Sequence, residues 1–471
     1  MRPLALFLIL ALSGCASDRG IGHRSTPAEP AALEAEKSLG AVTASGEWPA
    51  LDWWKRFADP QLDALVDEAL AASPNLRLAQ ARLDSARAQA RIAGAPLRPQ
   101  VNAEASINRQ RFSENYIFPP PIGGSSFTTT QLDLSASYEV DFWGRNRAAY
   151  EAAVGRTRAA QAEAFTSRLV LSSGVASVYV QLARAYEQLD LARRTLEDRE
   201  AVQRLTTDRV RAGLDSRLEL KQVETSIPAA RARIVQIEEE IALARTQLAA
   251  LLGKGPDRGL AIERPQLHMA AVSLPSRVPA DLLGRRPDIT AARARVEAAS
   301  RDIASAKAAF YPDVNLTALI GVQSVTLSKL LETGSAIPFA GAAIRLPIFD
   351  AGRLRGNLAA RNADYDAAVE QYNQALADAL REVVDQLASM RSVQVQRSEA
   401  DTALAAAEEA YNLAVTRYKA GIGSLLQVLT AETQVLEQRN LRADLHAREL
   451  ALSINLIRAL GGGFDVQVAM Q

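Results

Sequence analysis

The sequence predicts a mixed α and β membrane protein, with four long β-strands and several very long helices in each chain. Three observations support this fold class. The 471 residues contain two copies of one unit, each copy holds two segments that alternate apolar and polar residues, and long stretches of helix-forming composition follow them. Four strands are too few to close in a bilayer, so several copies are expected to complete the fold.

The repeat appears at a nearly constant offset. Pro74–Asn102 aligns without a gap on Pro287–Asn315, and the segment RVRAGLDSRLEL from Arg209 aligns on RYKAGIGSLLQV from Arg417. A repeat of about 210 residues is too long for a solenoid unit, so it indicates a duplicated half-domain. We predict a first repeat at residues 48–253, a linker at 254–285, a second repeat at 286–461 and a C-terminal tail at 462–471.

Composition excludes several classes of function. Lys and Arg number 54 and Asp and Glu also number 54, so no basic field suggests nucleic acid as a partner. Three His and one Cys argue against a metal cluster or a disulfide framework. No internal run approaches the roughly 20 apolar residues of a membrane-spanning helix. If this chain crosses a membrane, it does so on strands.

The N-terminus predicts export. Met1-Arg2 is a short basic region, an apolar stretch runs from Leu4 to Leu12, and Cys15 follows directly after Gly14. LSGC resembles the bacterial lipobox, which implies that residues 1–14 are a lipoprotein signal peptide and that Cys15 is acylated. Ala16 then implies sorting to the outer membrane, and residues 15–47 are expected to be a lipid-anchored tether. The alternative is an ordinary signal peptide with a chance cysteine.

The folded part is expected to open on helices. Asp59 is a predicted N-cap, Pro60 takes the first helical position, and apolar residues follow at helical spacing. Trp48, Trp53 and Trp54 precede this helix and are interpreted as a docking cluster for the incoming chain, with a ligand cage as the alternative. A second, Ala- and Arg-rich helix is predicted from Asn75 to about Ala93.

Each repeat then changes to a period of two residues, which predicts hairpins at about 100–142 and about 313–349. The apolar positions of the first strand are Val101, Ala103, Ala105 and Ile107. Thr128–Phe142 could span about 50 Å at roughly 3.3 Å per residue. One face is apolar and the other carries Asp, Glu, Ser and Arg, as in a lipid-facing, water-filled barrel. The alternative is a soluble two-faced sheet.

Very long helices are expected after the strands. Helical composition runs from Arg145 to about Arg211 and from Arg353 to about Lys419, close to 100 Å each at about 1.5 Å per residue. Seven-residue spacings of Leu, Val and Met within them predict coiled-coil-like packing. After a turn at each C-terminal end, the chain is predicted to return along Leu218–Leu252 and Leu425–Leu460. Pro228 is expected to kink the first return helix. Three copies would give twelve strands above a helical tube, which is a duct.

Four segments resemble the TolC-type outer-membrane factors of tripartite efflux systems, in their lipoprotein, NodT-like branch. They are WWKRFADPQLDALVDEAL, YEVDFWGRNRAAYEAA, LLGRRPDITAARARVEAA with AKAAFYPDVNLT, and RYKAGIGSLLQVLTAE. The resemblance implies a homotrimer with a 12-strand β-barrel in outer-membrane lipid and a 12-helix periplasmic tunnel. It implies passive export of drugs, metal ions or other small molecules. The implied partners are a periplasmic adaptor (membrane fusion protein) and an inner-membrane transporter of the RND type.

No catalytic, metal or cofactor motif appears in the sequence, so no enzyme activity, cofactor or resident metal is expected. His23, His268 and His446 are scattered along the chain, and solvated or structural roles are expected for them. An exported enzyme is one competing reading, disfavoured by this absence. A periplasmic scaffold without a pore is another, and the polar face of the strands argues against it.

The candidate sites therefore concern gating and docking. The turns after the long helices should form the closed periplasmic tip where an adaptor docks. The docking candidates are Arg211, Gly213, Ser216, Lys419, Gly421 and Ser424. Gly213 and Gly421 are predicted to cap the two long helices.

The resemblance also implies a gate in the second copy. Arg417 and Tyr418 match positions whose polar contacts hold the tip helices shut, and Leu426 and Thr430 match two constriction rings. Relatives often carry Asp where this chain has Thr430, so a weaker block by cations is expected, although Glu432 lies nearby on the helix. The alternative for Leu426 is a buried coiled-coil position. Because Val210 takes the place of Tyr418 in the first copy, a threefold rather than a sixfold tube is expected.

Overall fold

The computed structural model describes residues 17–29, 33–34, 36–39, 47–268 and 284–466. The predicted signal peptide and Cys15, and parts of the predicted tether, linker and tail, lie outside the described residues. The chain divides into two compact units. The sheet unit comprises the described residues of Met1–Pro27, Arg82–Gln161 and Ala291–Asn373, and the hairpin unit those of Ala28–Ala81, Ala162–Thr290 and Gln374–Gln471. None of the helices in the described ranges is long and apolar enough to span a membrane.

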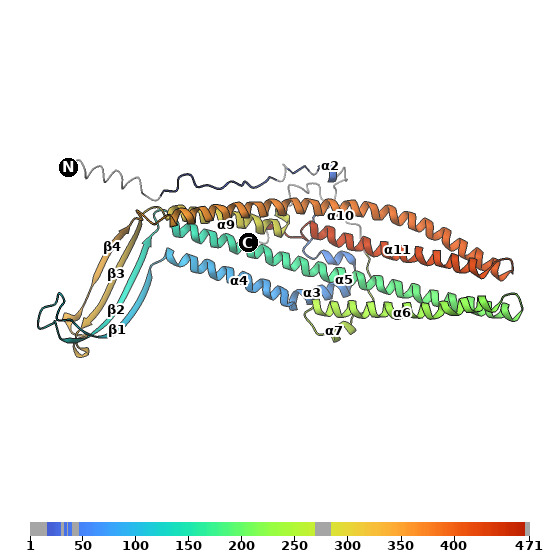
Figure 1. The fold of residues 1–471 in the computed structure, drawn as a ribbon, viewed down its shortest axis with the longest axis horizontal. Helices are drawn as coiled ribbons and strands as arrows, with labels where there is room; N and C mark the ends of the chain where they lie inside the picture. Colours follow the sequence, from blue (N-terminus) through green and yellow to red (C-terminus); the bar gives the residue numbers. More distant parts are fainter. Residues whose placement is uncertain (1–16, 30–32, 35, 40–46, 269–283, 467–471) are drawn as a thin grey trace. The chain divides into compact units, whose positions relative to one another are not determined.

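The sheet unit contains one four-stranded antiparallel sheet. Its strands are β1 (Gln100–Arg111), β2 (Ser126–Val140), β3 (Asp313–Ser324) and β4 (Phe339–Arg345). Their order is β1-β2-β3-β4, so the pairing of β2 with β3 joins the two copies of the repeat (Figure 1). The four strands predicted from the alternation are confirmed, although β4 has only seven residues against 12 to 15 in the other three.

Register gives the sheet two chemically different faces. Asn102 pairs with Ser135 and Glu104 with Asp133, whereas Ala103 pairs with Leu134 between them. Since side chains of one strand alternate between faces, one face is polar and the other apolar. On the apolar face Ile107 is 67% exposed. A soluble protein would bury such residues, so this apolar face is expected to lie against lipid or another apolar surface.

Helices in the sheet unit pack through small residues. The sheet unit takes in most of α4 (Pro74–Gly94) and of α9 (Pro287–Ala308), together with the beginnings of α5 and α10. A Cβ on Gly155 of α5 would lie 3.0 Å from the Cβ of Ala298 on α9, so the two helices approach closely there. Ala-rich composition permits this contact. A short 3-10 helix, η3 (Ala95–Leu97), connects α4 to β1, and η4 (Leu327–Lys329) and η5 (Thr333–Ser335) lie between β3 and β4.

The two long helices have the bounds that the sequence predicts. α5 is Arg145–Arg211 and α10 is Arg353–Lys419, each of 67 residues. Leu182 and Leu189, seven residues apart on α5, are both buried, as are Leu376 and Val383 on α10. This spacing places one apolar seam along each helix against its neighbours. The return helices α6 (Arg217–Leu251) and α11 (Leu425–Ala459) complete two helical hairpins, and α6 contains Pro228.

Entry of the chain into the hairpin unit is fixed by a buried cluster. η2 (Trp53–Phe57) buries Trp53 and Trp54, which are 1% and 2% exposed. Asp59 caps α3 (Pro60–Ala72) by accepting from the Gln61 amide at 2.9 Å, and it also accepts from the Tyr179 hydroxyl at 2.8 Å. The predicted N-cap is confirmed, and the burial of both Trp side chains supports docking rather than a ligand cage. Two four-residue helices, α2 (Glu36–Leu39) and α7 (Asp257–Leu260), complete the described elements.

Candidate functional site at the helical hairpin turns

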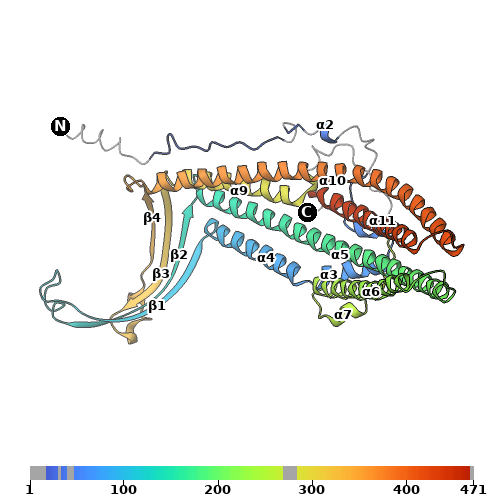
Figure 2. The same ribbon diagram turned by 45° about the vertical axis from the view of Figure 1, so that its right-hand side comes forward.

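The two hairpin turns of the hairpin unit lie at the same end of it (Figures 1 and 2). Gly213 and Gly421 adopt the left-handed conformation, with φ of +73° and +78°. In each turn the glycine amide bonds back three residues and the next amide bonds back five, as from Leu214 to Arg209 at 2.9 Å and from Ile422 to Arg417 at 3.0 Å. These bonds satisfy the last carbonyls of α5 and α10. The predicted capping role of both glycines is confirmed.

Each return helix begins with a capping box. The Ser216 hydroxyl and the Glu219 carboxylate cap α6, and Ser424 with Gln427 caps α11. Such reciprocal bonds fix where the returning helix starts. The turns themselves are solvent-facing: Lys419 is exposed, and Arg211 pairs at 3.3 Å with Asp208, both side chains being more than 70% exposed. The six predicted docking residues therefore lie together on or beside two accessible, well-defined turns.

Tyr418, near the end of α10, is the principal contact between the two turns. Its side chain is 1% exposed. Its hydroxyl donates to the carboxylate of Asp215 and lies 3.0 Å from the hydroxyl of Thr206. Both partners belong to the first repeat, so this residue links the two copies at their turns.

Arg209 and Asp215 form an ion pair beside Tyr418. Arg209 Nε and Nη2 donate to the two carboxylate oxygens of Asp215 at 2.8 and 3.2 Å, in a bidentate arrangement. The guanidinium carbon lies 4.4 Å from the centre of the Tyr418 ring. The hydrogen bonds from Arg209 lower the pKa of Asp215, while burial raises the pKa of Tyr418. Asp215 is therefore ionised and Tyr418 neutral at neutral pH.

An apolar cluster supports these polar contacts. Val202 of α5 and Val223 of α6 pack with Tyr418 of α10 and with Leu425 and Val428 of α11. All four helices thus contribute to one small core at the turns. Burial of this kind contributes about 25 cal/mol per Å² of apolar surface removed from water.

The four predicted gate residues fall into two pairs. Arg417 is exposed and donates to the Ile422 carbonyl at 3.4 Å, whereas Tyr418 is buried in the contact just described. On α11, Leu426 is 67% exposed and Thr430 is also exposed, with its hydroxyl bonded to the Leu426 carbonyl at 2.8 Å. Within one chain Leu426 is therefore not buried.

Glu432 does not share the exposure of Thr430. It is 8% exposed and accepts from Arg199 Nε at 2.9 Å. Burial raises the pKa of Glu432, and the hydrogen bond from Arg199 opposes that rise. Because its carboxylate is engaged between helices, Glu432 cannot replace the missing Asp at Thr430 as an exposed ring.

The sequence alone did not predict three residues of this contact, which are Thr206, Arg209 and Asp215. The repeat alignment carried one signal, because Arg209 aligns with Arg417 and Asp215 aligns with Gly423. A Cβ on Gly423 would lie 3.0 Å from the Tyr418 amide nitrogen, so a side chain at this position of the second copy would press on the end of α10. The first copy thus has a carboxylate, Asp215, where the second copy has Gly423, and this carboxylate is the one that Tyr418 and Arg209 contact.

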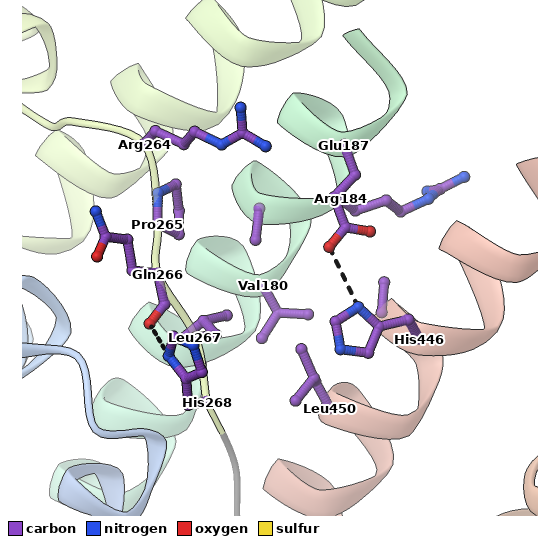
Figure 3. A pocket seen from close by; sticks show the side chains of 12 residues that line it. Val180, Arg184, Glu187, Arg264, Pro265, Gln266, Leu267, His268, His446 and Leu450 are labelled. Carbon is purple, nitrogen blue, oxygen red and sulfur yellow. Dashed lines mark hydrogen bonds and ion pairs between the residues drawn. The ribbon is translucent and has the colours of Figure 1, made fainter. Parts of the chain in front are cut away.

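A cavity of about 280 Å³ lies between α5, α11 and the segment 264–268 (Figure 3). His446 Nδ1 faces Glu187 Oε1 at 3.2 Å, and His268 lines the same cavity. The hydrogen bond to Glu187 raises the pKa of His446. Arg184 pairs with Asp444 at 2.7 Å and Arg264 with Asp190 at 2.7 Å. The histidine next to Glu187 thus has a structural ion-pairing role.

Within the described ranges, no cluster of His, Cys, Asp and Glu could hold a metal ion.

Comparison with known proteins identifies the family. The outer membrane efflux protein family matches residues 65–254 and 278–462. The chain belongs to this family. Fusaric acid resistance protein FusA of Burkholderia cepacia is 41% identical over 364 residues, covering 76% of this chain and 68% of that protein. Multidrug resistance outer membrane protein MdtP of Escherichia coli K12 is 33% identical over 470 residues, covering 96% and 94%.

Solved structures agree. The outer membrane protein VceC of Vibrio cholerae matches with a TM-score of 0.85 and 38% identity, covering 89% of this chain and all of that one. CusC, whose structure is described in terms of transmembrane channel formation, matches with a TM-score of 0.83 and 29% identity, covering 94% and 100%. The fold class predicted from the sequence is confirmed. The chain is the outer-membrane channel component of an efflux system, and this component extends into the periplasm.

Proposed function

We propose that three copies of this chain form a passive duct, with twelve strands closing a barrel in the outer membrane and twelve helices forming a periplasmic tunnel. The two-faced sheet carries this proposal. Its order leaves β1 and β4 as edges within one chain, and hydrocarbon tolerates no unpaired edge. Pairing of β4 with β1 of the next copy removes every unpaired strand edge. It also places the apolar face against lipid and the polar face around a water-filled lumen. A pore-free scaffold would not need that polar face.

Partners and cargo follow from the family. The duct receives solutes from an inner-membrane transporter of the RND type through a periplasmic adaptor, which docks on the turns around Arg211–Ser216 and Lys419–Ser424. Relatives are named for multidrug resistance, fusaric acid resistance and pyoverdine export. We propose drugs, metal ions or other small molecules as cargo for this chain. Catalysis has no part in this function.

The gate is proposed at the hairpin turns. Tyr418 holds the second hairpin against Asp215 and Arg209 of the first, and the exposed Leu426 and Thr430 form the constriction when three copies meet. Arg417, exposed beside Tyr418, is placed for a contact with a neighbouring copy. Lipid at Cys15 anchors the N-terminus to the outer membrane.

Cysteine cross-linking tests the closure of the sheet. Single cysteines at Ala103 of β1 and Ala342 of β4, and at flanking positions on the same face, are combined in pairs in a Cys15→Ser background fused to a cleavable export signal. Oxidation should yield covalent dimers and trimers on denaturing gels when both cysteines are present. Each single-cysteine variant is the control and should stay monomeric. Failure of every β1–β4 pair, with the protein present in the outer membrane, would contradict the trimeric barrel.

A further inference from the structure

A cavity lined by arginines lies in the sheet unit, where the strands meet the helices. Its volume is about 580 Å³. It is surrounded by the start of α5, by α9, by the ends of β3 and β4 that pair with each other, and by the start of α10. Figure 1 shows β4 leading toward α10. Its charged lining residues are Arg145, Arg345, Arg353, Arg361, Asp302 and Asp313. Four cations against two anions leave this lining with a formal charge of +2.

Two of these arginines lack an acceptor. The side chains of Arg345 and Arg353 are exposed and have no ion pair or hydrogen bond within the described parts of the chain. Arg145 is 4.0 Å from Glu139, and Arg361 pairs with Asp364 one turn away on its own helix at 3.2 Å. The guanidinium groups of Arg345 and Arg353 are therefore available to a ligand.

The acidic residues do not neutralise the cavity. Asp302 already pairs with Arg156. One carboxylate oxygen of Asp313 is buried without a hydrogen-bond donor, although Asp313 and Arg345 are register partners on β3 and β4. A donor-bearing group or an ordered water would satisfy that oxygen. The site thus offers a strong donor set with one acceptor at its wall.

Helix ends add to the positive field. α5 begins at Arg145 and α10 at Arg353, and neither first turn contains an acidic residue. The N-terminal end of a helix carries a partial positive charge, so an arginine there is unfavourable unless an anion accompanies it. Asp141 and Asp350, which precede these helices, are engaged with backbone amides, the latter with Leu354 at 2.8 Å. These two carboxylates cap the helix starts, while Arg145 and Arg353 line the cavity.

The sheet register places the cavity on the polar face. Asp313 and Arg345 pair, Asn315 lies two residues along β3, and Asn315 in turn pairs with Glu139. All four lie on the face that carries Asp133 and Glu104. In the duct of the proposed function this face surrounds the lumen, and the inference rests on that function.

We infer that this cavity binds the carboxylate, phosphate or sulfonate group of a small anionic solute in the lumen of the duct. Planar guanidinium groups bind such oxyanions through paired N–H donors, more strongly than a point charge does. Three copies set three such sites around the passage between barrel and tunnel. The duct would therefore concentrate anionic cargo at this level and favour its passage.

Equilibrium binding of radiolabelled sulfate to the full-length trimer in detergent, at low ionic strength, tests the site. The wild type should bind about one sulfate per chain. The Arg345→Gln/Arg353→Gln variant should bind at least about tenfold more weakly, because it loses the charge-assisted hydrogen bonds to the anion. Arg345→Lys/Arg353→Lys should fall between them. Arg109→Gln, on the apolar face of β1, removes the same charge as a control and should bind as the wild type does.

Two further measurements test assembly and the position of the bound anion. Gel filtration shows whether each variant is still a trimer, and the single Arg353→Gln change, at an exposed helix start, serves if the double variant does not assemble. Selenate soaked into crystals should give an anomalous peak between Arg345 and Arg353. Sulfate binding that is unchanged in the arginine variants, or replaced in wild type by tightly held phosphatidylglycerol, would overturn the site. The β1–β4 cross-link reports the duct independently, so the two proposals can fail separately.

Discussion

Arg209 Nη1 donates a hydrogen bond of 2.8 Å to the main-chain carbonyl of Tyr418. An arginine of the first repeat thereby caps the last turn of the long helix of the second repeat. Cations are favoured at that end of a helix because of its partial negative charge. The same guanidinium binds Asp215 and lies over the Tyr418 ring, so one side chain joins three parts of the contact. This concentration of interactions makes the hairpin turns sensitive to single substitutions.

Asp215→Asn should loosen the contact most. The carboxylate balances a mostly buried guanidinium, the two side chains being 9% and 10% exposed. Because both partners belong to the first turn, the loss favours separated turns through the charge left unpaired against Tyr418. That cost is up to about 3 kcal/mol, or on the order of a hundredfold in the equilibrium between closed and separated turns. Hydrogen exchange at the Gly421 and Ile422 amides should accelerate, and single-channel conductance in planar bilayers should rise.

Asp208→Asn is the matched control for that change. Asp208 pairs with Arg211 at 3.3 Å, but both side chains are largely exposed, so the pair contributes about 0–1 kcal/mol. Equal acceleration of exchange in the two variants would contradict the assigned role of Asp215.

In the wild type, the lowered pKa of Asp215 means that its stabilisation is present above its unfolded pKa of about 3.9 and is lost as the pH falls through the lower folded value.

Tyr418→Phe should have a smaller effect. The ring and its burial are retained, while the bonds to Asp215 and Thr206 are lost. A hydrogen bond to a charged group contributes about 1.5 kcal/mol net, so the separated state should gain about tenfold. Thr206→Val, which leaves the Asp215 bond intact, should change the conductance less than Tyr418→Phe does. If Phe at this position leaves conductance and amide exchange at wild-type values, the hydroxyl has no part in closure.

Thr430→Asp should tighten block by multivalent cations. Thr430 is exposed, so three copies would bring three added carboxylates to one ring, and charge rings of this kind select and retain cations. The midpoint for block by hexamminecobalt(III) should fall at least about tenfold. Glu432→Gln should leave the midpoint unchanged, because Glu432 is paired with Arg199. Wild-type block as tight as that of Thr430→Asp would refute the weak-block hypothesis.

Much of the fold could be predicted because its signals are local. The bounds of α5 and α10 follow from helix-forming composition that continues without a proline to the turns at Gly213 and Gly421. The strands follow from alternation whose register the sheet then confirms. The turn glycines were predictable for the same reason: only a left-handed residue ends a helix in this way.

The contact at the turns could not be predicted in this way. Asp215 and Tyr418 are 203 residues apart, and neither residue type nor spacing indicates that they meet. The direction of Glu432 depends on the rotation of α11 against α5, since Thr430 is exposed two residues earlier while Glu432 is buried. Residues two apart on a helix point in different directions, so nearness in sequence was a poor guide to a shared ring.

The pair of His446 and Glu187 should make stability depend on pH near neutrality. The hydrogen bond raises the pKa of His446, so its stabilisation is fully present below the unfolded pKa of about 6.5 and is lost as the pH rises through the raised folded value. His446→Gln should therefore lower the Tm more at pH 6 than at pH 8.5, measured by calorimetry of the detergent-solubilised protein. His268→Gln, which changes the other histidine lining the same cavity, is the control variant. The pair would have no pH-dependent role if His446→Gln lowered the Tm by the same amount at pH 6 and pH 8.5.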